Sequence, residues 1–200
     1  MSFYSGKVWQ VVKANCCMFI VKGSLRMGIA EQPSKAKLFL AILYHKDAAI
    51  DRLIKKVCSE FGPIDTTYGP IPFAFTDYYE DEVGQDPLKY YLTFERTIER
   101  DVLPSIKTLT NAIESEYCVD GKRKANLDPG YLGKDKLVLA STKDFYHRIY
   151  LSQGIYGEVT LHFRKGIFRY FSWTYPDYKD EAFLEFLTKT RAAFVHSLPV

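Results

Sequence analysis

The sequence lacks the patterns that mark several large protein classes. Its 200 residues contain four cysteines and no CxxC pair, which argues against a disulfide framework or a zinc knuckle and fits a reducing compartment such as the cytoplasm. No run of 18 apolar residues is present, so we expect no membrane span. The chain has no GxxxxGKS/T phosphate loop and no GxSxG elbow, which excludes a P-loop GTPase and gives a serine hydrolase no support.

The charge is unevenly distributed along the chain. The composition, 47% hydrophobic and 26% charged, is that of an ordinary globular protein with a net charge of +3. Residues 47–119 hold 14 acids and 7 bases, whereas residues 120–170 hold 10 bases and 5 acids. A basic block on an otherwise acidic chain predicts an anionic ligand, with an ordinary solvated surface as the alternative.

The N-terminal segment differs from the rest of the chain. Residues 1–34 show weak periodicity, and the first 30 of them contain four cations and no acid. A second methionine, Met27, stands shortly before the first predicted strand, where a start codon would be natural. We therefore predict a non-core extension over residues 1–34, with Met27 as an alternative start, and a single α+β domain over residues 35–200. Deletion of residues 1–26 should leave the melting temperature nearly unchanged.

The first part of that domain follows a β-α-β-β-α-β order. The apolar run Ala36–Tyr44 predicts a buried strand, and an apolar stripe from Ile50 to Phe61 predicts a helix capped by Asp47 and ended by Gly62-Pro63. Four further elements follow: an edge or bent strand Ile64–Phe75, a half-buried strand Lys89–Ile98, a helix Asp101–Tyr117, and a strand Lys122–Leu127 ended by a turn at Asp128-Pro129-Gly130. This order predicts a ferredoxin-like antiparallel sheet with two helices on one face.

The remainder predicts a strand meander and a C-terminal helix. Residues 133–143 are interpreted as a short apolar helix or turn. Three strands are then expected, at Tyr146–Leu151, Tyr156–Phe163 and Ile167–Trp173, joined by tight turns that contain glycine. The last helix is expected to begin at Asp177 and to bury Phe183, Phe186, Leu187, Thr190 and Phe194.

Alternation along the middle strand of the meander predicts the floor of a cleft. Val159, Leu161 and Phe163 should face the core, so Glu158, Thr160, His162 and Arg164 should share the other face. With His147 or Arg148 from the neighbouring strand, that face could form a site. Plain solvation of one sheet face is the alternative.

A second polar cluster follows residue 121. Lys122, Lys124 and Asn126 should point to one side of a strand, where two cations and an amide could hold a phosphate or carboxylate. An edge strand guarded by lysines is the alternative. The sequence STKD at 141–144 is only weakly similar to the guanine-binding box of GTPases, and a turn explains it better.

The candidate site combines both clusters. The candidate catalytic residues are Asp144, His147 and Glu158, and the candidate ligand-binding residues are Lys122, Lys124, Asn126, Asp128, Lys143, Arg148 and His162. Histidine and carboxylate could also bind a metal, but their spacing is unspecific, so the metal and any cofactor stay unknown.

Seven stretches carry a resemblance to a known family. They are KLFLAILY, FGPID, FTDYYEDEVG, GKRKANLDPGYL, LVLASTKDFYHRIYL, GIYGEVTLHFRKG and WTYPDY. With them the chain resembles, from about Ala36 to Leu198, an uncharacterised bacterial family called domain of unknown function 4416. The resemblance implies a small, soluble bacterial protein with no established activity, and no functional residue is carried over from it.

Three functions follow as expectations. The first is binding of, or catalysis on, a phosphorylated or nucleotide-like small anion. The second is an RNA-binding module that stacks bases on exposed aromatic side chains such as Tyr91. The third is a non-catalytic scaffold or subunit that uses the WTYPDY loop as an interface. Whether the protein is an enzyme stays open at this point, as does its oligomeric state.

Overall fold

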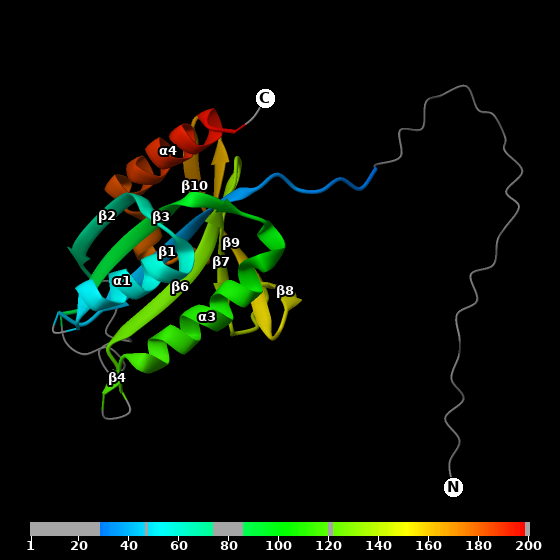
Figure 1. Cartoon of the computed structure of the whole chain (residues 1–200). Helices are drawn as coiled ribbons and strands as arrows, with labels where there is room; N and C mark the ends of the chain where they lie inside the picture. The colour runs from blue at the N-terminus through cyan, green and yellow to red at the C-terminus, as the bar shows by residue number, and fades with distance from the viewer. Residues whose placement is uncertain (1–28, 47, 74–85, 120–121, 199–200) are drawn as a thin grey trace, which may run out of the picture. The chain divides into compact units, whose positions relative to one another are not determined.

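One antiparallel sheet organises the computed structural model, which describes residues 29–46, 48–73, 86–119 and 122–198 (Figure 1). The elements are β1 (Ala36–Tyr44), α1 (Ile50–Phe61), β2 (Ile64–Pro72), β3 (Leu88–Ile98), η2 (Arg100–Val102), α3 (Leu103–Glu116), β4 (Cys118–Val119), β5 (Lys122–Arg123), β6 (Ala125–Leu132), β7 (Lys136–Ser141), β8 (Ile149–Ser152), β9 (Ile155–Arg164), β10 (Ile167–Tyr170), η3 (Pro176–Lys179) and α4 (Glu181–His196). The strand order is β10-β9-β7-β6-β1-β3-β2, with β8 also paired to β9 and β4 paired only to β5. Residues 33–200 cluster as one unit.

The predicted buried strand at Ala36–Tyr44 is confirmed, because all nine residues of β1 are buried. Its side chains alternate between two cores. Leu40 and Ile42 pack in the cluster that holds Leu53 of α1 and Ile113 of α3. Phe39 and Ala41 pack in the cluster that holds Phe183 and Leu187 of α4. Two helices therefore cover one face of the sheet and α4 covers the other (Figure 1), and each fully buried Leu or Phe contributes roughly 1.5–3 kcal/mol.

The helices predicted at Ile50–Phe61 and Asp101–Tyr117 are present as α1 and α3, whereas the last helix begins later than predicted. Helix α1 spans the predicted stripe and ends at Gly62, whose φ of +93° favours glycine. The predicted cap Asp47 lies outside the described residues. The prediction that Asp177 caps α4 is wrong: Asp180 accepts the hydrogen bond from the Phe183 N–H at 2.9 Å. Asp177 lies one turn earlier, buried in η3.

Strand β3 is more deeply buried than its alternation predicts. Leu92 and Phe94 lie in the α1–α3 core, as expected for one face. On the opposite face Tyr91 and Thr93 are also completely buried, because α4 packs against them, and only beyond them does Glu95 become exposed. The expectation of a half-buried strand is therefore wrong, and Tyr91 is not available to stack on RNA bases.

Strand β6 continues through the predicted turn at Asp128-Pro129-Gly130, and this correction has a physical reason. Strands β6 and β7 pair only from Gly130 to Leu132, so β7 diverges from the first half of β6. The backbone N–H and C=O of Leu127 point into the resulting split, where side chains bond them. Pro129 faces the same side, because backbone groups two residues apart share a direction. Its missing N–H therefore costs no strand pairing.

Residues 133–143 were predicted as a helix or turn and instead contain strand β7, with four buried residues in a row from Leu137 to Ala140. The pairing of β7 with β9 is shifted by one residue between Leu137 and Val138. Thr160 is the extra residue in β9, since Val138 pairs with Val159 and Leu137 pairs with Leu161. Such a bulge moves the following side chains to the other face.

Because of this bulge, the prediction that one face of β9 forms the floor of a cleft is wrong. Val159 packs in the cluster of Leu103 and Val138, whereas Leu161 packs in the cluster of Phe183. Glu158 and His162 consequently lie on opposite faces of the sheet, not in one polar row. The predicted meander itself is confirmed, with tight turns at Gln153-Gly154 and Lys165-Gly166 that have positive φ at both residues.

No helix in the described part of the chain combines the length and the apolar character that a membrane crossing requires.

Candidate functional site

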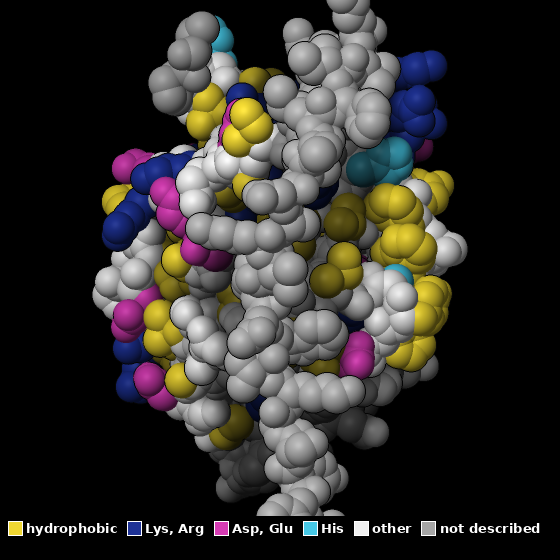
Figure 2. All heavy atoms as spheres, turned by 90° about the vertical axis from the view of Figure 1, so that its right-hand side faces the viewer, with side chains coloured by type: hydrophobic (Ala, Val, Ile, Leu, Met, Phe, Trp, Pro, Cys, Tyr) yellow, Lys and Arg dark blue, Asp and Glu magenta, His cyan; other side chains and the backbone are white. Residues whose placement is uncertain are grey.

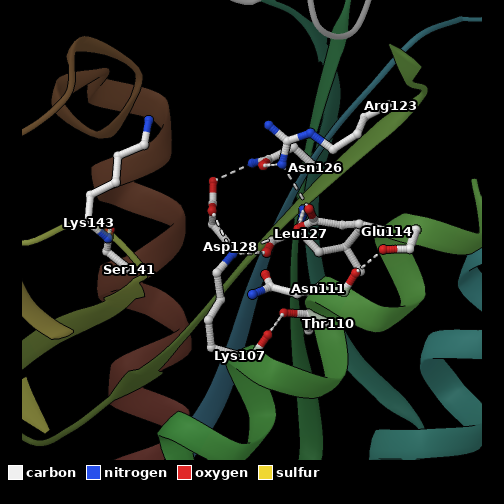
Figure 3. A network of polar contacts seen from close by, with 11 residues as sticks. Lys107, Thr110, Asn111, Glu114, Arg123, Asn126, Leu127, Asp128, Ser141 and Lys143 are labelled. Carbon is white, nitrogen blue, oxygen red and sulfur yellow. Dashed lines mark hydrogen bonds and ion pairs between the residues drawn. The ribbon is translucent and has the colours of Figure 1, made fainter. Parts of the chain in front are cut away.

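The split between β6 and β7 opens into a cavity of about 750 Å³. One wall comes from β6 and α3, with Lys107, Glu114 and Asp128. The opposite wall comes from the end of β7 and the residues after it, with Ser141 and Lys143. Figure 3 shows these two groups facing each other across the opening. The segment Tyr175–Tyr178 and the start of β3 complete the lining.

Two buried charges of α3 bond the backbone that the split leaves unpaired. Lys107 Nζ donates to the Leu127 carbonyl at 2.8 Å, and the Leu127 N–H donates to Glu114 Oε1 at 2.8 Å. Lys107 Nζ also lies 3.3 Å from Asp128 Oδ1 and 3.7 Å from Glu114 Oε1 (Figure 3). Buried charges are tolerated only when they are paired and bonded in this way. This pair therefore supports the strand as well as the cavity wall.

The network extends along β6 toward the mouth of the cavity. Arg123 donates to Glu114 Oε2 at 3.0 Å and to Asn126 Oδ1 at 3.4 Å. The Asn126 amide in turn donates to Asp128 Oδ2 at 2.7 Å. These bonds fix the amide and the carboxylate in defined orientations beside the cavity (Figure 3).

The pKa values of the two carboxylates of this wall are shifted in opposite directions. Burial raises the pKa of Glu114 above its ordinary value, although Lys107 and Arg123 act in the opposite direction. Burial also tends to raise the pKa of Asp128, but the charges of Lys107 and Lys89 and two hydrogen bonds outweigh it, so the pKa of Asp128 is lowered. Asp128 is therefore a firmly ionised acceptor at neutral pH.

A third group of buried polar residues lies under η3. Lys89, only 5% exposed, sits 3.5 Å from Asp177 Oδ2, which also accepts a hydrogen bond from the Tyr91 hydroxyl at 2.9 Å. The ammonium group lies over the rings of Phe73 and Tyr178 at 5.5 and 5.8 Å. Burial, and then the charge of Asp177, raise the pKa of Tyr91 strongly. Tyr91 is therefore a neutral hydrogen-bond donor that holds Asp177 in place.

The segment after β7 is tethered to β9 through Glu158. Both His147 Nε2 and Arg148 Nε lie 2.9 Å from Glu158 Oε2, and all three side chains are nearly buried. Arg148 also donates to Ser141 Oγ at 3.0 Å and to the Lys143 carbonyl at 3.1 Å. Burial tends to lower the pKa of Arg148, but bonding to Glu158 raises it overall. Arg148 therefore holds the backbone that carries Lys143 at the rim.

The structure brings together about half of the predicted site residues. Asn126, Asp128, Lys143, Arg148 and Glu158 line the cavity, and His147 contacts it only through Glu158. Lys124 and the exposed Asp144 do not line the cavity, and His162 lies at a separate hollow on the other side of the β9 bulge. The side chain of Lys122 lies outside what the structure describes.

Five charged residues of the cavity were not predicted from the sequence: Lys89, Lys107, Glu114, Arg123 and Asp177. A signal existed for α3. Lys107, Asn111 and Glu114 recur at helical spacing beside the apolar stripe, so a polar stripe could have been identified. Nothing local distinguishes Lys89 from an exposed strand lysine, because its burial depends on η3, far along the chain.

Nothing in the described ranges groups three or more His, Cys, Asp or Glu side chains so that they could hold a metal ion. The interpretation of Asp144, His147 and Glu158 as metal ligands therefore has no geometric support, since Asp144 is exposed and only the other two residues are bonded to each other.

Comparison with known families gives one match. The model of a family described as domain of unknown function (DUF4416) matches residues 34–194, which is most of the chain. No curated protein and no solved structure matches the chain.

Proposed function

We propose that this chain, which belongs to the family described as domain of unknown function (DUF4416), binds a phosphorylated, nucleotide-like small molecule in the split between β6 and β7. The observation that carries the proposal is the cavity itself. It measures about 750 Å³, and polar groups from seven separate elements converge on it. Cavities of this size with a few fixed polar groups are the usual form of small-molecule sites.

The charge of the lining favours an anionic group on the ligand. Five cations line the cavity, Lys89, Lys107, Arg123, Lys143 and Arg148, against the four carboxylates Glu114, Asp128, Glu158 and Asp177. The excess of one positive charge is small, but the cations are unevenly distributed over the walls of the cavity. Lys143 is exposed at the rim, and Arg148 fixes the backbone beneath it. A phosphate is therefore expected at this wall, where Lys143 can act as a point charge.

The other walls suit the rest of a nucleotide-like molecule. The rings of Phe73 and Tyr178 line the cavity beside Lys89, and the ring of Tyr175 also lines it, so that aromatic side chains can pack against a flat base. Asn126 and Asp128 lie at the opposite wall, with the ionised Asp128 as an acceptor for the N–H groups of a base.

We propose binding and assign no reaction to the site. Glu158, the predicted catalytic carboxylate that lines the cavity, is already engaged by Arg148, His147 and Thr160. Two partners lie 2.9 Å from one oxygen of this carboxylate. Glu158 therefore holds the rim segment in place and is not positioned as a base that accepts a proton from a ligand.

Two further proposals concern the fold and the compartment. The strand order β6-β1-β3-β2, with α1 and α3 on one face, supports a ferredoxin-like origin for the first four long strands, extended at the β6 edge by the meander. The two cysteines among the described residues, Cys58 and Cys118, form no disulfide, which supports a reducing compartment such as the bacterial cytoplasm.

Thermal-shift titration tests the binding proposal. Nucleoside mono-, di- and triphosphates are compared with the corresponding nucleosides, sugar phosphates and inorganic phosphate. We expect the melting temperature to rise with the concentration of a phosphorylated nucleoside, because a ligand stabilises by about RT ln(1 + [L]/Kd). The nucleoside without phosphate should shift the melting temperature much less.

Two substitutions locate the site. Lys143→Ala should weaken binding of the phosphate part, and Asp128→Asn should change the preference among bases. Lys189→Ala is the matched control, because Lys189 is a 75% exposed lysine of α4 paired with Glu185 and does not line the cavity. A shift that survives both site substitutions, or that the control abolishes equally, contradicts the proposal.

A second candidate, a non-catalytic subunit, is favoured by a different observation. Phe145, Tyr146, Ile149, Tyr150 and Leu151, in and before β8, are each 41–78% exposed. Apolar side chains gathered on a surface mark interaction sites. Sedimentation velocity over a range of concentrations tests this candidate. Association that Ile149→Lys with Tyr150→Lys abolishes supports it, and a monomer at all concentrations contradicts it for self-association.

A further inference from the structure

A stretch without acids follows Glu158. Residues 159–176 contain three cations, Arg164, Lys165 and Arg169, six aromatic residues, and no Asp or Glu. Its cations lie in and around the β9–β10 turn, and all three are exposed. Figure 2 shows Lys and Arg side chains gathered at one corner of the molecule, with hydrophobic and His side chains continuing from them along the same margin.

The strand register aligns these residues into a basic row. Lys136 of β7 pairs with His162 of β9, and His162 pairs with Arg169 of β10, so the three side chains lie side by side across the sheet. Arg164 pairs with Ile167 two residues further along the same face. Asp135 lies 3.4 Å from Lys136 Nζ, which offsets that one charge. We call Lys136, His162, Arg164, Lys165 and Arg169 the basic corner.

The basic corner surrounds a hollow. Seven residues of the β9–β10 hairpin line about 660 Å³ of space: His162, Arg164, Lys165, Ile167, Phe168, Arg169 and Tyr170. Three of them are cations, one is a histidine, and none is acidic. A concave surface of one charge sign concentrates a counter-charged partner.

Aromatic rings continue from this corner toward the cavity. His162 lies 5.0 Å from Phe171, Phe171 stacks on Trp173 at 4.6 Å, and Trp173 stacks on His147 at 5.2 Å. His147 lies 4.9 Å from the ring of Tyr146, which is 78% exposed. This aromatic strip runs beside β9, whose six-residue step from Glu158 to Arg164 covers roughly 20 Å.

We propose that the basic corner and the aromatic strip bind single-stranded nucleic acid. Exposed cations at one end can contact phosphates. Tyr170, 55% exposed in the hollow, and Tyr146, 78% exposed at the far end of the strip, can stack on bases, which is the combination used by sequence-tolerant single-strand binders. An anionic membrane or polyphosphate would need the cations alone and would make no use of the rings. This surface differs from the buried Tyr91 face, and it does not depend on the ligand of the β6–β7 cavity.

Fluorescence anisotropy with a labelled single-stranded RNA of about 12 nucleotides tests the proposal, with DNA of the same sequence as a second probe. The variant Arg164→Ala, Lys165→Ala, Arg169→Ala should lose about tenfold or more in affinity at low salt. Three phosphate contacts predict a slope of roughly −2 for log K against log salt, which should largely disappear in the variant. The matched control is Lys46→Ala, Arg52→Ala, Lys55→Ala, which removes three exposed cations elsewhere.

The role of the rings needs a separate variant. Tyr146→Leu with Tyr170→Leu keeps apolar side chains but removes the two exposed rings, and it should weaken RNA binding about fivefold while leaving the binding of inorganic polyphosphate unchanged. Three results would each overturn the proposal: equal RNA affinity in wild-type protein and the triple variant, an equal loss in the matched control, or RNA binding that Tyr146→Leu with Tyr170→Leu does not change. Vesicles of anionic lipid that bind when RNA does not would also overturn it.

Discussion

The β6–β7 cavity and the basic corner contain similar side chains used in opposite ways. In the cavity, Lys107 is buried against two carboxylates and a carbonyl, and Lys89 lies between a carboxylate and two rings. At the basic corner, Arg164 and Arg169 are exposed in a stretch without acids. Buried charges must be paired for the fold to form, whereas exposed charges cost little and remain accessible to large partners. The comparison therefore predicts strong stability effects in the cavity and weak ones at the corner.

The largest effect is expected for Lys107→Met. This change removes the cationic partner of the buried Glu114 and of the partly buried Asp128, and it leaves the Leu127 carbonyl without its side-chain donor. The free energy of unfolding should fall by about 3–5 kcal/mol, as for other broken buried pairs. Urea denaturation measures it. A loss below 1 kcal/mol would mean that the network is not needed to hold the split.

Gly130→Ala should have the next largest effect, because it changes the point where β6 and β7 begin to pair. An added Cβ would lie 2.3 Å from the Val138 carbonyl and 2.7 Å from Leu139 Cδ2. We expect a loss of about 1–3 kcal/mol in the free energy of unfolding. Gly133→Ala, after β6 and before β7, is the control, since its nearest neighbours would lie at 3.6 Å. Equal losses in both variants would contradict this account of the split.

Asp128→Asn should have a smaller, pH-dependent effect of about 1 kcal/mol at neutral pH. The pKa of Asp128 is lowered below its ordinary 3.8 in the folded state. Its contribution to stability is therefore present above pH 3.8 and is lost as the pH falls through the folded pKa. The difference between wild type and variant should be constant near neutral pH and vanish on acidification. Thermal unfolding followed between neutral and acid pH measures it, and a difference that grows in acid has the wrong sign.

The smallest effect is expected at the basic corner. Arg164→Ala, Lys165→Ala and Arg169→Ala should each change the free energy of unfolding by no more than about 0.5 kcal/mol, because exposed charged side chains contribute little. Chemical denaturation of each single variant measures this. A loss of unfolding free energy as large as that of Lys107→Met would contradict the predicted difference between the two regions.

Much of the fold was predictable because local patterns decide it. The apolar run of β1, the stripe of α1 with its terminal glycine, and the hairpin turns at residues 153–154 and 165–166 are each encoded within a few residues. Strand β7 was not predicted, since six residues with a buried centre suit a helix or a strand equally.

The candidate site was predictable only in part, because long-range structure builds it. The faces predicted from alternation along β9 are wrong beyond Thr160, because the bulge there depends on the partner strand and not on the β9 sequence. The turn expected at Pro129 became a strand because α3 bonds the unpaired backbone beside it. Lys143, Arg148 and Glu158 were found as a polar cluster, but Lys89 and Asp177, which pair with each other, reach the same cavity through tertiary packing.

A nuclear magnetic resonance titration of the ¹⁵N-labelled protein with a nucleoside monophosphate tests the central claim, that the split between β6 and β7 is a small-molecule site. We predict that backbone amides of residues 126–128 and 141–143 shift in a saturable manner, while those of residues 164–169 do not. Shifts confined to the β9–β10 hairpin, with none at the split, would contradict the account.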